Sequence, residues 1–150
     1  MIMMNHLLTG AVIALTVKQP ELMIPLAYAS HFVLDSVPHY GEGKNGDEYS
    51  KNSLSWTMIT IDALVSGTFL FWLVNTHHYM LLLGALLAYM PDATWIYRFM
   101  HYRVTKRRTG RNRMSRFHER LQREYSWAYG LEFAYMIIAL STLFAELQHI

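Results

Sequence analysis

Residues 54–74 read LSWTMITIDALVSGTFLFWLV, and Asp62 is the only charged residue among them. The length of this segment is close to the ~20 residues that an α-helix needs to cross the hydrocarbon core of a membrane. The segment therefore predicts a membrane-spanning helix. A chain built around such a segment is expected to fold as an all-α membrane bundle.

Four more apolar segments flank this one, at about 2–17, 22–37, 79–99 and 128–147. The segment at 79–99 is also near spanning length. The first two segments are short for a crossing, so a re-entrant hairpin is an open alternative there. We expect one membrane domain over residues 1–150, with four or five transmembrane helices, and we favour five.

The composition supports this class and limits the chemistry. Hydrophobic residues make up 53% of the chain, which has ten Met and ten Tyr but no Cys. Disulfides and thiolate metal ligands are therefore excluded. The first residues lack the basic region of a secretory signal peptide, so we expect the first segment to be a retained helix. Gly-rich phosphate loops, serine-hydrolase elbows and His-Glu-x-x-His motifs are absent from the sequence.

Basic residues gather in one place, since ten of the thirteen Lys and Arg lie between positions 98 and 123. Basic loops favour the cytoplasmic side, so we expect a multi-pass protein of the prokaryotic inner membrane with its N-terminus inside. Within about 111–126, Met114, Phe117, Leu121 and Tyr125 recur at helical spacing, which predicts an amphipathic helix on the membrane surface. Its arginines are expected to contact anionic headgroups of membrane lipids. They are Arg111, Arg113, Arg116, Arg120 and Arg123. Nucleic acid is not an expected partner, because spanning segments flank this region.

Two histidines and a carboxylate lie within nine residues at the end of the second segment. His31 and Asp35 are four positions apart and so share one face of a helix. Pro38 disfavours a helical Val37 and should end the helix there, which lets His39 turn back. This spacing could form half of a divalent-metal site. The alternative is a local arrangement in which Asp35 satisfies a backbone group and His39 lies in the aqueous interface.

Two further carboxylates lie inside spanning segments, where a charged group costs on the order of 2.5–3.5 kcal/mol by insertion scales. Asp62 has apolar neighbours on both sides, and a bound dication would be one suitable partner. The alternative is a protonated Asp62 that hydrogen-bonds across helices. Asp92 follows Pro91, which suggests a broken helix that aims the carboxylate inward. The alternative is a proline kink with Asp92 paired to Arg98.

The predicted topology places the polar groups of five segments at one depth and on one side. His6 lies near the inner end of the first segment and joins the candidate ligands on that ground. His118 could be a ligand, a general acid or an ordinary interfacial histidine. Glu132 could support a ligating histidine or pair with an arginine of the surface helix. We assign His118 and Glu132 as the candidate catalytic acid or base.

Three pieces of sequence carry a likeness to a known family: His6-Leu-Leu-Thr-Gly, then Ser30-His31-x-x-Leu34-Asp35-x-x-Pro38-His39, and later Pro91-Asp92. Over about the first hundred residues the chain resembles the YdjM-like inducible membrane-bound metal-dependent hydrolases. It also resembles, more distantly, the zinc-dependent phospholipase C group. The resemblance implies a divalent metal, zinc first with Mn or Mg as alternatives, and hydrolase activity. The ligands that it implies are His6, His31, Asp35, His39 and Asp92, to which Asp62 is added from its own position.

The favoured hypothesis is therefore a membrane-embedded metal-dependent hydrolase that acts on a lipid or another phosphoester at the cytoplasmic face. A small proton-coupled transporter is the first alternative, because intramembrane aspartates with nearby histidines are also typical of proton relays. A membrane interaction protein whose metal only joins helices is the second.

Overall fold

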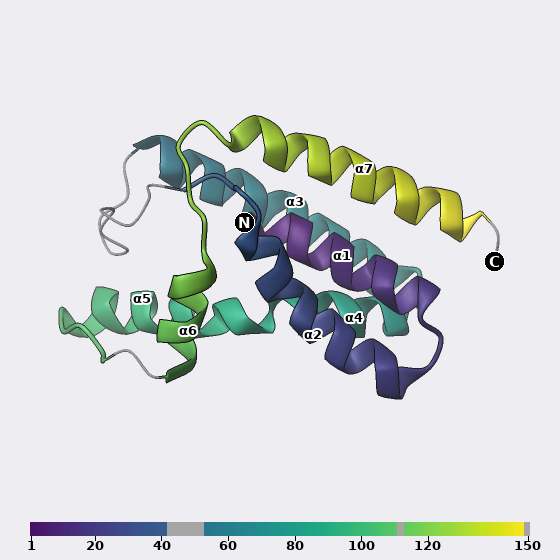
Figure 1. Cartoon of the computed structure of the whole chain (residues 1–150), viewed down its shortest axis with the longest axis horizontal. Coiled ribbons are helices and arrows are strands. Elements are labelled where there is room, and N and C mark those ends of the chain that lie inside the picture. The colour runs from purple at the N-terminus through teal and green to yellow at the C-terminus, as the bar shows by residue number, and fades with distance from the viewer. Residues whose placement is uncertain (42–52, 111–112, 149–150) are drawn as a thin grey trace.

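The computed structural model describes residues 1–41, 53–110 and 113–148, and these form an all-α structure (Figure 1). The helices run in the order α1 (Met3–Thr16), α2 (Pro20–Ser36), α3 (Ser53–Asn75), α4 (Tyr79–Tyr89), the 3-10 turn η1 (Met90–Asp92), α5 (Ala93–Thr105), α6 (Arg113–Leu121) and α7 (Tyr129–Leu147). The five predicted apolar segments all form helices, and the predicted all-α class is confirmed.

Helix α1 lies at the centre of the bundle and packs against α2, α3, α4 and α7 (Figure 1). Its most extensive contact is with α4, and small residues permit it. A Cβ atom at Gly10 would overlap the carbonyl oxygen of Gly84, so the two backbones approach closely at this crossing. Small residues at helix crossings are typical of membrane bundles. The close approach holds the start of α1 beside the polar residues described below.

Three helical stretches are long and apolar enough to cross a membrane: Leu54–Asn75, Tyr79–Thr105 and Tyr129–Leu147. Large apolar side chains such as Leu64, Phe71 and Ile138 are more than half exposed on these helices. An apolar outer surface of this kind is suited to lipid. With 14 and 17 residues, α1 and α2 are shorter than a full crossing requires. The prediction that they also span therefore stays a prediction.

The second long stretch is interrupted at Pro91, as the sequence suggests. The chain passes from α4 through the 3-10 turn η1 into α5, and Asp92 lies at the junction. Proline lacks the backbone N–H that would continue the helical hydrogen bonding. The interruption turns the carboxylate of Asp92 toward α2 and α6, where its partners lie.

The predicted surface helix is shorter than expected. It ends at Leu121, so Tyr125 does not belong to it, and Arg111 lies outside the described residues. Residues 123 and 125 instead form backbone hydrogen bonds to the end of α2 and to the residues just after it. Arg123 N–H donates to the carbonyl of Asp35 at 3.1 Å, and Tyr125 N–H donates to the carbonyl of His39 at 2.8 Å. These long-range bonds replace the helical ones and dock α6 against the site.

A candidate metal centre

The end of α2 has the local structure that its sequence predicts. The helix ends at Ser36, and Val37 takes an extended conformation before Pro38. His31 and Asp35 lie one turn apart on the buried face of the helix, and both are fully buried. Asp35 Oδ2 lies 3.3 Å from His31 Nε2. This pair forms the base of the site.

Two more residues from distant parts of the chain complete a group of four. His118 of α6 brings its Nε2 to 2.5 Å from Asp35 Oδ2 and to 2.9 Å from His31 Nε2. Asp92 Oδ1 lies 3.7 Å from His31 Nε2 and 3.9 Å from His118 Nε2. One ligand atom from each of the four residues lies within 4.8 Å of every other. The group could hold a metal ion.

The tautomer of His31 is compatible with metal binding. Its Nδ1 lies 2.9 Å from the carbonyl oxygen of Ala88 in α4. A carbonyl oxygen only accepts, so Nδ1 must carry the proton and donate. Nε2 of a neutral His31 then presents a lone pair toward Asp35 and His118. A backbone acceptor behind a ligating imidazole is the usual support of a histidine ligand.

No family is assigned by comparison. No protein-family model, no curated protein and no solved structure matches this chain. The function must therefore be argued from the site itself, and the resemblance noted in the sequence is one support among others.

The structure places one of the other predicted ligands, His6, in contact with the group. His6 Nε2 lies 3.3 Å from Asp35 Oδ1, and its ring stacks on that of His31 with centroids 4.1 Å apart. The amino group of Met1 lies 2.8 Å from the same carboxylate oxygen. His39 is also buried, and its backbone is held by Arg123 and Tyr125. Burial and, as a smaller cause, the nearby Met1 amino group together lower the pKa of His39 to about 4, so this imidazole is neutral at pH 7.

Asp62 and Glu132 have other partners. Asp62 accepts the backbone N–H groups of Met3 at 2.6 Å and Met4 at 3.0 Å, which belong to the first turn of α1. It therefore caps α1, in the manner of a carboxylate at a helix N-terminus, and it is not one of the four clustered residues. Glu132 accepts from Asn5 Nδ2 at 2.7 Å and from the backbone N–H groups of Ile2 and Tyr40.

These bonds give Asp62 and Glu132 an organising role that sequence reasoning missed. Glu132 joins the start of α1 to the turn that carries His39, and Asp62 joins the same part of α1 to α3. The one available sequence signal was Asn5, a polar residue next to His6 on an apolar segment. The Ala88 carbonyl that orients His31 gives no signal in the sequence, because any residue has one.

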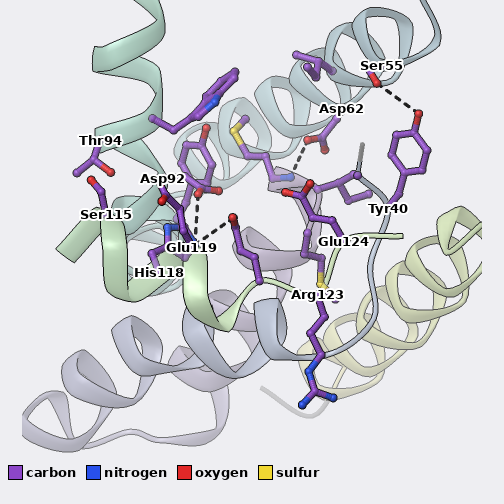
Figure 2. A pocket seen from close by; sticks show the side chains of 18 of the residues that line it. Tyr40, Ser55, Asp62, Asp92, Thr94, Ser115, His118, Glu119, Arg123 and Glu124 are labelled. Atoms are coloured by element: carbon purple, nitrogen blue, oxygen red, sulfur yellow. Dashed lines mark hydrogen bonds and ion pairs between the residues drawn. The ribbon is translucent and has the colours of Figure 1, made fainter. Parts of the chain in front are cut away.

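A pocket of about 1140 Å³ opens beside the four-residue group, and Asp92 and His118 line it (Figure 2). Asp92 is 20% exposed, so it is the member of the group that small molecules reach most easily. Figure 2 shows Asp62 and Tyr40 on the opposite wall. Both basic and acidic residues also line the pocket: Arg98, Arg116, Arg120 and Arg123, with Glu119 and Glu124. Arg98 is paired with Glu119 at 3.4 Å. The pocket thus joins a potential metal ligand set to groups that bind anions.

Proposed function

We propose that this chain is a membrane-embedded metal-dependent hydrolase that acts on a phosphoester at the cytoplasmic face. The observation that carries the proposal is the buried group of His31, Asp35, Asp92 and His118 at the wall of a pocket that arginines also line. Two imidazoles and two carboxylates are ligands suited to zinc and to other divalent ions.

The mixture of buried and accessible ligands fits a catalytic ion better than a purely structural one. Of the four residues, His31 and Asp35 are fully buried, whereas Asp92 and His118 border the pocket. A metal held there would supply a Lewis acid that lowers the pKa of bound water and polarises a phosphoryl oxygen. The chain's own contribution is to fix the ligands, through the Ala88 carbonyl behind His31 and the backbone bond from Arg123 to Asp35.

The arginines of the pocket and its position support a phosphoester, and a lipid in particular. Arginine binds phosphate oxygens with two parallel hydrogen bonds, and the lining includes Arg116 and Arg120 of α6. The same helix exposes Met114 and Phe117, which are 43% and 51% exposed. An amphipathic helix of this kind suits the lipid interface. The resemblance to membrane-bound metal-dependent hydrolases points to the same class of activity.

The experiment is to purify the protein in detergent and to measure metal content and hydrolysis together. A chromogenic phosphodiester and a short-chain phospholipid would serve as probes. We expect at least one equivalent of zinc or manganese, and hydrolysis that a chelator removes and the metal restores. Asp35→Ala should lose both, whereas His101→Ala, a histidine of α5 outside the group, should keep both. A wild-type protein that binds no divalent metal would overturn the proposal.

A further inference from the structure

The carboxylate of Asp35 faces two different sets of partners with its two oxygens. Oδ2 lies toward His31 and His118, at 3.3 Å and 2.5 Å from their Nε2 atoms. Oδ1 lies toward His6 Nε2 at 3.3 Å and toward the Met1 nitrogen at 2.8 Å. A carboxylate oxygen has two lone pairs, so the Met1 contact leaves one lone pair of Oδ1 available. Asp35 is therefore placed to serve two sites at once.

His6 is the unexplained residue on the Oδ1 side. It is fully buried, and neither of its ring nitrogens makes a hydrogen bond to any residue that the structure describes. Its Nε2 approaches Asp35 Oδ1 without the geometry of a hydrogen bond. Buried polar atoms without partners cost on the order of 1–3 kcal/mol each. A metal ligand would have this arrangement, because two ligand atoms of one tetrahedral zinc lie about 3.3 Å apart.

His39 has the same unusual feature. Its Nδ1 lies 2.8 Å from the carbonyl oxygen of Val37, so Nδ1 donates and Nε2 carries the lone pair. That Nε2 is buried and makes no hydrogen bond among the described residues. Glu132 connects the two histidines, since it holds Asn5 beside His6 and the backbone of Tyr40 beside His39. One carboxylate thus links the two chain segments that carry these histidines.

We propose that the protein binds a second divalent metal ion on the Oδ1 side of Asp35, with His6 and His39 as its histidine ligands. Asp35 would lie between this ion and the one that His31, Asp92 and His118 would hold. The inference extends the proposed function, because it takes the first metal site as given. Paired ions about 3.5–4 Å apart are typical of enzymes that displace a phosphoryl oxygen in line. A second ion would thus support the phosphoester class of the proposed function.

Manganese provides a test that does not depend on activity. Detergent-purified protein is freed of metal with a chelator, titrated with Mn²⁺ alone, and followed by metal analysis and electron paramagnetic resonance. We expect two equivalents in the wild type and the spectrum of a spin-coupled pair, because a bridging carboxylate couples the two ions. His6→Ala should bind one equivalent with the spectrum of an isolated ion. His39→Ala should do the same, and His101→Ala should behave as the wild type.

The outcomes separate this proposal from the one on which it rests. One equivalent of uncoupled manganese in both the wild type and His6→Ala would overturn the second site and leave the first intact. No bound manganese in the wild type would overturn both. Two uncoupled ions whose stoichiometry is unchanged in His6→Ala would also overturn the bridged pair. The wild-type spectrum needs no variant, so a variant that fails to fold does not prevent the test.

Discussion

The Nε2 atoms of His31 and His118 lie 2.9 Å apart, although 87 residues separate them in the sequence. Because Nδ1 of His31 donates to the Ala88 carbonyl, a neutral His31 has no proton on Nε2. The two Nε2 atoms can lie this close if that of His118 donates a proton to that of His31, or if the lone pairs of both atoms point at one bound cation. Asp35 and Asp92 beside them favour the cation.

The first prediction follows from this pair. His118→Ala removes one of four candidate ligands and should weaken zinc binding at the first site by at least about 100-fold, since loss of even a supporting partner costs 10–100-fold. Competition with a chromophoric chelator measures the dissociation constant. His101→Ala is the matched control, because His101 lies on α5 outside the group. Equal affinities in the two variants would assign His118 to hydrogen bonding alone.

The second prediction concerns Glu132, which holds both ends of the second site. Glu132→Gln keeps the size of the side chain but removes its charge and half of its acceptors for Asn5, Ile2 and Tyr40. We expect metal affinity at the second site to fall 10–100-fold while the helix content stays unchanged. Glu146→Gln is the control, since Glu146 lies exposed near the end of the same helix. Metal titration monitored beside far-ultraviolet circular dichroism checks both points.

The sequence predicts the parts of this site that depend on local spacing. His31 and Asp35 share a helix face because they are four residues apart, and Pro91 interrupts a helix and frees Asp92 to face inward. His118 could be given three roles from the sequence, because its position depends on how α6 docks. That docking rests on backbone bonds from residues 123 and 125 to the end of α2, and backbone groups carry no sequence signal.

Hydrogen bonding of Asp62 across helices is one of the two alternatives that the sequence offers, but its specific partners and the end of the surface helix could not be predicted, for the same reason. Asp62 is a buried carboxylate of a spanning segment, and a metal is one partner that such a group can find. In the structure the N–H groups at the start of α1 are its partners, which depends on where that helix end packs. The apolar period through Tyr125 suggests a helix, but pairing with His39 replaces its last turn.

The third prediction tests the close crossing of α1 and α4. Gly10→Ala adds a methyl group that would overlap the Gly84 carbonyl oxygen, so the helices must separate. We expect a loss of about 1–3 kcal/mol in the free energy of unfolding, as for other overpacked contacts. Gly67→Ala is the control, because a Cβ at Gly67 of α3 meets no atom within 4 Å. Unfolding of both variants in mixed detergent micelles measures the difference, and an unaffected Gly10→Ala would contradict the crossing.

The fourth prediction concerns the stability of the metal-free protein in acid. The pKa of His39 is lowered to about 4 in the folded state, against ~6.5 in an unfolded chain. Between these values the unfolded state binds a proton that the folded state does not, so stability falls as the pH falls through this range. The loss is at most about 3 kcal/mol. Melting temperatures of chelator-treated protein from pH 7.5 to 4.5 measure it, and His39→Gln should flatten the profile.

The fifth prediction places α6 at the lipid interface. The chain has no cysteine, so a single introduced one can carry a nitroxide spin label. Met114 and Phe117 are exposed on the apolar side of α6, and Glu119 lies near them on the same helix.

In lipid nanodiscs, labels on Met114→Cys and Phe117→Cys should collide more with oxygen, which concentrates in the bilayer, than with a water-soluble nickel complex. The label on Glu119→Cys should show the reverse preference, because Glu119 lines the pocket together with arginines, whose charged groups favour contact with water. If all three labels collide equally with the nickel complex, α6 lies in water. The proposal of a lipid substrate would then lose the structural observation behind it, whereas the proposed metal site would be unaffected.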